Sequence, residues 1–494
     1  MTCLHHAIQT QYSTIKTNCI GYRGITVTTG TATETSETHT FIDHVMTTIR
    51  ARIAAKSLIP GDRLPSIRGG ARQFGVSNST MVEAYDRLVT EGTISSRRGS
   101  GFFVSGHTAP LSIAQIGPKL DRAIDPFWVS RQSLDARPEM LKPGCGWLPS
   151  DWMPTAAIRR ALRNISRSND AILTDYAPPL GLMALRQLLS RRMAGYGIEA
   201  GPDQIVLTDS GTQAIDLLCR FLIEPGDTVL IDDPCYFNFQ ALLRAHRANI
   251  IGVPFTPNGP DVDAFARLAA IHNPRLYITN SGLHNPTGTS LSPMVAHRIL
   301  KTVEENDLIV IEDDIFADFE TSPSPRYAAL GGFDRIIHIG SFSKTLSASV
   351  RCGYIATRPD WIDGIADLKI ATGFSGANLS AELVLSVLKD GTYRRHMENL
   401  HARLSRAMDV TQTRLKSLGI TPVITPDAGI FLWCRLPDGI DAAIVAHNAL
   451  VDGVVLAPGN VFSISQSANN LMRFNVAQCA DDRVFDVLAR AMQT

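Results

Sequence analysis

One lysine, Lys344, lies among hydroxyl groups and is the first candidate for covalent chemistry. It belongs to the stretch IIHIGSFSKTLSASVR, residues 336–351, in which an apolar run ends and serines surround the lysine. A short apolar run of this kind predicts a buried strand. Because lysine amines form imines with carbonyl compounds, this position indicates a covalent site for an aldehyde.

Polar residues follow several other short apolar runs in the same way. Asn285 comes shortly after RLYITN, Asp313 ends LIVIED, and Tyr236 follows DTVLID. Ligands of open α/β sheets bind beyond the carboxyl ends of the strands, so these groups are expected at one edge. After DQIVLT the chain continues into a helix start that suits an anion, with the residues Ser210, Gly211, Thr212 and Gln213.

A ligand that needs an amine, a carboxylate, an amide, an aromatic face and an anion cradle is pyridoxal phosphate. Lys344 is expected to form the imine and Asp313 to keep the ring nitrogen protonated, since a carboxylate favours the cation. Asn285 is expected to hydrogen-bond the ring oxygen. The predicted phosphate ligands are Ser210, Gly211, Thr212, Gln213, Ser341, Ser343 and Arg351.

Two further side chains have a predicted role in this site. Tyr236 is expected to stack on the cofactor ring, although Tyr236, Phe237 and Phe239 also fit a place in the core. Arg473, in NNLMRFNVA, is expected to grip the α-carboxylate of an amino compound with its planar fork, with a surface arginine as the alternative.

The elements that must position these residues alternate between strand and helix patterns. This rhythm predicts an α/β domain with a mostly parallel sheet covered on both faces. From about residue 385 a helix-rich stretch leads to GIFLWCRLP and LMRFNVA, which indicate a smaller α+β subdomain. Residues 141–494 are therefore predicted to form one cofactor-binding domain, and the family resemblance described below implies that this domain also dimerises.

Residues 41–105 predict a separate winged helix-turn-helix domain. FIDHVMTTIRARIAA carries a helical apolar stripe, and Ser66 and Ser77 are N-caps of two further helices. TISSRRGSGFFV predicts two short strands with a Gly-Ser-Gly tip. Lys and Arg outnumber Asp and Glu by nine to five in this unit, whereas the whole chain is neutral, so the positive charge is concentrated where DNA phosphates could meet it.

Within this unit the start of the third helix is expected to reach base edges of double-stranded DNA. Arg68 is a second candidate for a base contact, while Arg63, Arg97 and Arg98 are expected to meet phosphates. The residues expected at the base edges are Ser77, Asn78, Ser79 and Thr80.

The cysteine spacing and the apolar runs indicate the cellular environment and exclude a membrane-spanning helix. The eight cysteines of the 494 residues are scattered without a CxxC pair, which favours a reducing cytoplasm and makes a metal site unexpected. No apolar run is long enough for a membrane helix. The Thr-rich residues 1–40 are predicted to be a disordered preface, and the proline-containing residues 106–140 a linker.

With these motifs identified, the sequence resembles known families. HNPTG, EDD and SFSK followed by Arg351 stand in the order and spacing of fold-type I aminotransferases, and residues 41–105 resemble GntR-type regulators. The fusion resembles the MocR subfamily of transcription factors, to which PGCGWLPSDWMP, DYAPPLG and APGNVFS also correspond. This resemblance implies a head-to-tail homodimer in which Tyr176 reaches the phosphate of the partner subunit.

Two features of the sequence depart from the family pattern. Ile315 and Phe316 stand where the family often has a tyrosine that donates to the cofactor's oxygen, so efficient transamination is not expected. Asn78 stands where relatives commonly have arginine, which favours adenine as the contacted base.

Three functions remain compatible with these residues. The first is a regulator that senses a small amino compound through external aldimine formation at Lys344. The second is a pyridoxal-phosphate-dependent aminotransferase with a vestigial DNA-binding domain, and the third is a repressor whose large domain only dimerises. The fused DNA-binding unit and the missing tyrosine favour the first over the second, and the complete set of cofactor residues argues against the third.

Overall fold

The chain forms two units, residues 1–110 and residues 111–494, each with its own hydrophobic core. The computed structural model describes residues 41–54, 58, 60–97, 101–105 and 126–493. The predicted preface, residues 1–40, lies outside the described residues.

The smaller unit is the predicted winged helix-turn-helix. Ser66 and Ser77 cap its second and third helices, because each hydroxyl accepts a backbone N–H three residues ahead. Three helices and an antiparallel hairpin follow one another as predicted: α1 (Phe41–Ala54), α2 (Ile67–Phe74), α3 (Asn78–Thr90), β1 (Ile94–Arg97) and β2 (Gly101–Val104).

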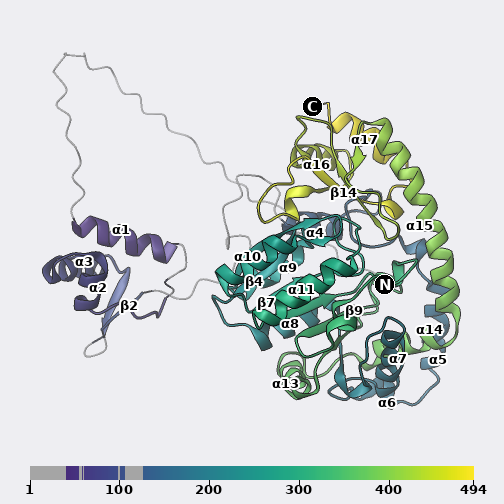
Figure 1. Cartoon of the computed structure of the whole chain (residues 1–494), viewed down its shortest axis with the longest axis horizontal. Helices are drawn as coiled ribbons and strands as arrows, with labels where there is room; N and C mark the ends of the chain where they lie inside the picture. The colour runs from purple at the N-terminus through teal and green to yellow at the C-terminus, as the bar shows by residue number, and fades with distance from the viewer. Residues whose placement is uncertain (1–40, 55–57, 59, 98–100, 106–125, 494) are drawn as a thin grey trace, which may run out of the picture. The chain divides into compact units, whose positions relative to one another are not determined.

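A mostly parallel sheet organises the larger unit, and all five strands predicted for it are present (Figure 1). The strand β10 is antiparallel to both of its neighbours and was not predicted. The order across the sheet is β3 (Ile205–Thr208), β10 (Gly353–Ala356), β9 (Ile336–Ser341), β8 (Ile309–Asp313), β7 (Leu276–Thr279), β4 (Thr228–Asp233), β5 (Asn249–Thr256) and β6 (Gly259–Pro260).

The register of the central strands brings their polar ends together. Strands β7, β8 and β9 run parallel, with Thr279 opposite Glu312 and Asp313 opposite Ile339. Their carboxyl ends therefore meet at one edge of the sheet, as expected for a ligand site in an open α/β fold.

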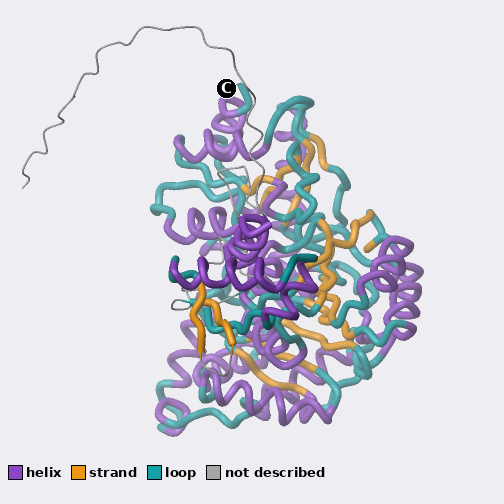
Figure 2. The backbone as a smooth tube through the Cα atoms, turned by 90° about the vertical axis from the view of Figure 1, so that its left-hand side faces the viewer, coloured by secondary structure: helices purple, strands orange, loops and turns teal. Residues whose placement is uncertain are grey.

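Helices lie on both faces of this sheet, which explains why its strands are apolar on both sides (Figure 2). None of the helices in the described part of the chain is long and apolar enough to cross a membrane. The longer covering helices include α7 (Met183–Ala194), α8 (Gly211–Leu222), α9 (Phe237–Ala245), α10 (Val262–His272), α11 (Pro293–Glu305), α13 (Ile362–Gly373) and α14 (Asn378–Lys389).

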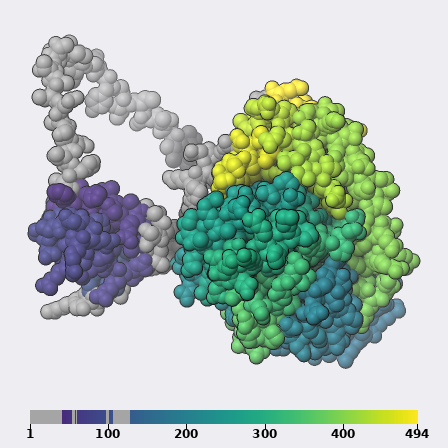
Figure 3. Space-filling model, in the orientation of Figure 1, coloured from purple at the N-terminus to yellow at the C-terminus, as the bar shows by residue number. Residues whose placement is uncertain are grey.

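The C-terminal residues form the predicted smaller α+β part, coloured yellow-green at one end of the larger unit in Figure 3. The long helix α15 (Thr392–Ser417) leads into it. Its antiparallel sheet has the order β11 (Thr421–Pro422), β12 (Phe431–Arg435), β14 (Leu471–Asn475) and β13 (Ala457–Pro458), with the helices α16 (Ala442–Val451) and α17 (Arg483–Ala491).

The prediction of a linker over residues 106–140 is wrong for its second half. Helix α4 (Pro126–Asp135) lies there, and Val129 and Ser133 on it are only 2% exposed. Proline is tolerated in the first turn of a helix, so Pro126 marks a helix start here instead of irregular chain. The predicted linker residues 106–125 lie outside the described residues.

Candidate functional site

Lys344 lies just beyond the end of β9 and is half-buried. Its Nζ donates a hydrogen bond to the carbonyl oxygen of Gly146 at 2.7 Å. Burial, assisted by the positive charge of Arg473, lowers the pKa of Lys344 to about 8. An amine with this pKa is partly neutral near pH 8, and the neutral form is the nucleophile.

Asp313 is the last residue of β8 and points its carboxylate into the same cavity as Lys344. Its Oδ1 accepts the backbone N–H of Ile315 at 3.1 Å. Burial raises the pKa of Asp313 to about 7, with a smaller contribution from the neighbouring Asp314. A cation placed beside Asp313 would favour the ionised form of this carboxyl group.

Asn285 and Arg473 come from distant parts of the sequence and form one hydrogen-bonded pair. Nη1 of Arg473 donates to Oδ1 of Asn285 at 2.7 Å, and Nη2 donates to the carbonyl oxygen of Gly144 at 2.8 Å. The Arg473 guanidinium also lies over the rings of Phe431 and Phe462, at 4.1 and 4.7 Å from their centroids. Arg473 is only 1% exposed, so it is not the surface arginine of the alternative interpretation.

The loop that brings Gly146 to Lys344 is fixed by pairing with the C-terminal part. Backbone N–H groups of Leu141 and Gly144 donate to the carbonyl oxygens of Gly453 and Val455. A Cβ on Gly144 would lie 2.4 Å from the backbone carbon of Leu456, so only glycine fits this close approach.

The predicted anion cradle lies where β3 turns into α8. Ser210 is the N-cap of α8, and Gly211 and Thr212 line the cavity in the first helical turn, where backbone N–H groups lack helical partners. Gln213 differs from the prediction, because its N–H donates to Ser210 Oγ at 3.0 Å and its Oε1 accepts from Asp209 N at 2.6 Å. Its N–H and Oε1 close the helix start, and Gln213 is not among the residues that line the cavity.

The serines after β9 have two different positions. Ser343 and Arg351 line the cavity, whereas Ser341 lies behind them. Ser341 Oγ is 2.9 Å from Ser343 Oγ and donates to the carbonyl oxygen of Cys352 at 3.2 Å. Ser341 is therefore placed to orient Ser343 and not to contact a ligand itself.

Lys344, Asp313, Asn285 and Arg473 line one cavity of about 310 Å³, together with the first turn of α8, Ser343 and Arg351. Tyr236 and Phe237 both line it, whereas Phe239 is fully buried in the core. Phe316, which stands near the position of the family's tyrosine, also lines the cavity and packs edge-on against Phe431 at 5.5 Å between ring centroids.

Two buried polar atoms at this cavity have no hydrogen-bond partner among the described residues. They are Oδ1 of Asn280 and Nε of Arg473. Buried polar groups are nearly always satisfied, so such atoms in a cavity suit a polar ligand. Sequence reasoning missed Asn280, although it ends the RLYITN run and could have been found by the same strand-end argument.

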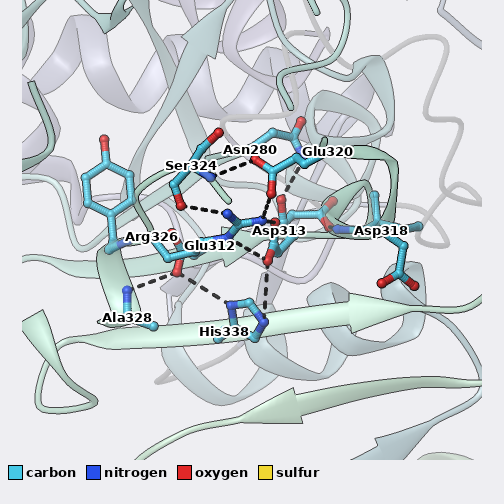
Figure 4. Close-up of polar contacts among 12 residues, drawn as sticks. Asn280, Glu312, Asp313, Asp318, Glu320, Ser324, Arg326, Ala328 and His338 are labelled. Atoms are coloured by element: carbon cyan, nitrogen blue, oxygen red, sulfur yellow. Dashed lines mark hydrogen bonds and ion pairs between the residues drawn. The ribbon is translucent and has the colours of Figure 1, made fainter. Parts of the chain in front are cut away.

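A second charged cluster lies behind Asp313 (Figure 4). Arg326 is fully buried and pairs with both Asp314 and Glu320. His338 lies 3.5 Å from Glu312 and 3.9 Å from Asp314. Since successive residues of a strand point to opposite faces, Glu312 and Asp314 face this cluster while Asp313 faces the cavity.

Tyr176 does not line the cavity of its own chain. It is 76% exposed and packs against Phe374, which is 63% exposed, with 4.7 Å between ring centroids. An exposed aromatic pair of this kind is available to a second molecule.

The start of α3 is exposed in the smaller unit, at Ser77, Asn78 and Ser79. The Ser77 hydroxyl accepts the N–H of Thr80 at 3.0 Å and lies 2.8 Å from the Ser79 hydroxyl, which leaves Asn78 as the more available side chain. Thr80 is half-buried, and its hydroxyl lies 2.8 Å from that of Ser77.

The arginines of this unit lie beside the recognition helix and the wing. Arg68 and Asn78 line one surface hollow together with Arg72, which sequence reasoning missed. Nε of Arg63 lies 3.5 Å from an ideal Cβ position on Gly101, so Arg63 flanks the hairpin. The Arg97 side chain and Arg98 lie outside the described residues.

Comparison with known families matches both units. Residues 148–491 match the family described as aminotransferase class I and II, and residues 41–104 match the bacterial regulatory proteins of the gntR family. The uncharacterized HTH-type transcriptional regulator YdcR of Escherichia coli is 28% identical over 87% of this chain and 93% of its own length. The HTH-type transcriptional regulator NorG of Staphylococcus aureus is 25% identical over 83% of this chain and 94% of its own length.

Solved structures share the fold of the larger unit. The α-aminoadipate aminotransferase LysN of Thermus thermophilus, solved with N-(5'-phosphopyridoxyl)-L-leucine, has a TM-score of 0.68 at 24% identity, over 74% of this chain and 94% of its own. The kynurenine aminotransferase of Pyrococcus horikoshii, solved with PMP, has a TM-score of 0.68 at 23% identity, over 76% and 94% of the two chains.

Proposed function

Because the chain belongs to the aminotransferase class I and II family and also carries a GntR-family DNA-binding domain, we propose that it is a pyridoxal-phosphate-dependent transcriptional regulator of the MocR type that responds to an amino compound. One observation carries the proposal: a half-buried Lys344 amine of lowered pKa shares a cavity with Asp313, Asn285 and Arg473, in a chain that also exposes a recognition helix.

Pyridoxal phosphate supplies an aldehyde that reacts with amines and a ring that withdraws electrons. Lys344 would hold it covalently, and Asp313 would keep a proton on the ring nitrogen. Asn285 would donate to the ring oxygen, and Tyr236 would pack on the ring. The first turn of α8, with Ser210, Gly211 and Thr212, would bind the phosphate together with Ser343 and Arg351.

An amino compound is recognised at two points. Its amino group would compete with Nζ of Lys344 for the cofactor's aldehyde, and its carboxylate would bind the planar fork of Arg473. The fork now donates to Asn285 and Gly144, so effector binding must compete with these two hydrogen bonds. A freed Lys344 amine and the effector's negative charge would then alter the packing around the cavity.

Helix α4 offers a route by which this change reaches DNA. It lines the cavity and is the first described element after the winged-helix domain along the chain. A ligand that shifts α4 would move the C-terminal end of the segment that joins the two units. Coupling between two sites of this kind is typically about 1–3 kcal/mol, or roughly 5- to 150-fold in DNA affinity.

A head-to-tail homodimer completes the proposal. Exposed Tyr176, paired with Phe374, is available to reach the phosphate in the partner subunit's cavity. A dimer also presents two winged helices to two half-sites of a DNA operator, as two-fold DNA-binding proteins do. We place this regulator in the cytoplasm, where the DNA lies.

The second candidate is a true aminotransferase, favoured by the shared fold. Against it, Ile315 and Phe316 carry no hydroxyl for the cofactor's oxygen. Turnover of purified protein with amino acids and keto acids separates the two functions, since enzymes typically reach about 1–1000 per second. Turnover in that range would contradict the proposal that this protein is a regulator.

The proposal is tested by the absorbance spectrum of purified full-length protein incubated with pyridoxal phosphate. Wild-type protein should bind the cofactor with a shifted long-wavelength band, and Lys344→Ala should lose that band. Lys389→Ala, on the exposed end of α14, is the control and should keep it. Adding amino compounds should shift the wild-type band and change the affinity for DNA from its own upstream region.

A further inference from the structure

The effector cavity has one wall formed by helix α4. Val129, Ser130, Ser133 and Leu134 of this helix line the cavity together with Phe237 at the start of α9. α4 packs against α9, as Figure 1 also shows. These residues therefore belong to the binding site, although none of them follows a strand of the sheet.

Ser133 is the unusual residue on this wall. It is only 2% exposed, and its hydroxyl oxygen has no hydrogen-bond partner among the described residues. A serine inside a helix commonly bonds to the carbonyl of the preceding turn, and a buried hydroxyl without any partner is costly. Its position on a ligand cavity indicates that the missing partner is a ligand group.

The charges around the cavity limit the chemistry of that group. Lys344, Asp313, Arg351 and Arg473 are its charged lining residues, and the proposed function assigns each of them to the cofactor or to the effector's carboxylate. The described residues of α4 that line the cavity have hydroxyl or aliphatic side chains. A second charge on the effector would lose its hydration here without a counter-charge.

We propose that Ser133 recognises an uncharged hydroxyl or amide on the effector's side chain, so that the effector is a neutral polar amino acid. This inference rests on the proposed function. An aliphatic side chain would leave the Ser133 hydroxyl unpaired, and a charged one would meet no opposite charge among the described α4 residues that line the cavity.

The test is a spectral titration of the cofactor-loaded full-length protein with near-isosteric pairs of amino acids. L-Threonine is compared with L-valine, L-asparagine with L-leucine, and L-aspartate serves as the charged probe. In wild-type protein the polar member of at least one pair should bind about two- to tenfold tighter, as one neutral hydrogen bond allows. In Ser133→Ala the two members of that pair should bind equally.

Two control variants make the result specific. Ser166→Ala removes an exposed serine hydroxyl at the end of α5 (Thr155–Ile165), away from the cavity, and should keep the wild-type preference. Ser130→Ala removes the other hydroxyl of the α4 wall. Ser133→Ala should fold, because alanine favours helix and the lost hydroxyl has no partner, and an unchanged thermal midpoint checks this.

The possible results distinguish a failure of the Ser133 role from a failure of the proposed function. If Ser133→Ala keeps the preference, if only Ser130→Ala loses it, or if L-aspartate binds tightest, the role of Ser133 is overturned while the regulator remains. If no amino acid changes the wild-type spectrum, the proposed function fails and this inference fails with it.

Discussion

Nη1 of Arg473 lies 2.7 Å from Oδ1 of Asn285, so the two residues form a direct hydrogen bond across 188 positions of the sequence. Arg473 is the proposed ligand of an effector carboxylate, and Asn285 is the proposed ligand of the cofactor's ring oxygen. Occupancy of the carboxylate site is therefore linked to the cofactor through a single contact.

Replacement of Arg473 should selectively remove recognition of the carboxylate. In Arg473→Lys the planar fork and its stacking on Phe431 and Phe462 are lost, and a lysine does not replace them. The preference for L-alanine over ethylamine in spectral titrations should fall by about 10-fold or more, since hydrogen bonds to charged groups contribute about 1.5–3 kcal/mol. An unchanged preference would remove Arg473 from the effector site.

Lys344 should make the stability of the cofactor-free protein depend on pH. Its pKa is lowered from 10.5 to about 8, so below pH 8 the folded protein carries the cost of a partly buried charge. Lys344→Met should therefore raise the thermal midpoint at pH 7. The gain should shrink as pH rises from about 8 to 10.5. The exposed Lys389→Met is the control, and a gain independent of pH would contradict the prediction.

Arg326 should be essential for stability. It is 0% exposed and pairs with Asp314 and Glu320, so Arg326→Met leaves two buried carboxylates without their cation. Breaking a buried pair in this way costs about 3–5 kcal/mol, measured as the free energy of unfolding in urea. The loss should decrease as pH falls towards 6, because burial raises the pKa of Asp314 to about 6 even beside Arg326, and removing that cation raises it further, so that protonation removes one uncompensated charge in the variant first.

The matched control for Arg326 is the surface pair of Arg160 with Asp390, which lie 2.9 Å apart. Arg160→Met should change the free energy of unfolding by only about 0–1 kcal/mol. Equal losses in the two variants would show that the cluster behind Asp313 is not a strongly coupled unit.

Asn78 and Arg63 should affect DNA binding in different ways. Asn78→Ala should weaken binding to the operator by about 1–3 kcal/mol and leave binding to unrelated DNA unchanged, because a base contact carries sequence information. Arg63→Ala should weaken both and reduce the slope of log affinity against log salt by about 1, as a phosphate contact does. Fluorescence anisotropy over a salt series measures both effects, and the reverse pattern would exchange the two roles.

Most of the fold was predictable from local patterns. The predicted strands and the caps Ser66 and Ser77 depend on neighbouring residues alone, and all are present. The linker prediction failed where proline residues suggested irregular chain although a helix is present, as in the segment that contains α4. β5 was not predicted, and it contains a glycine and a proline, which usually argue against a strand.

The site was predictable only where chemistry follows a strand end. Lys344, Asp313 and Asn285 were found because parallel strands deliver their carboxyl ends to one edge, and Asn280 could have been found by the same argument. For Gln213 the sequence does not say whether a polar side chain binds a ligand or closes the start of its own helix, as the Gln213 Oε1 does.

The sequence by itself determined the elements, their order and the residue types at the sheet edge, since these follow from periodicity and from capping within a few residues. Only the tertiary structure decided that Lys344 contacts Gly146, 198 residues away, and that α4 closes the cavity with Ser133. Such contacts depend on how strands and loops pair across the whole chain. The same long-range packing removes water from Lys344 and Asp313 and so shifts both of their pKa values.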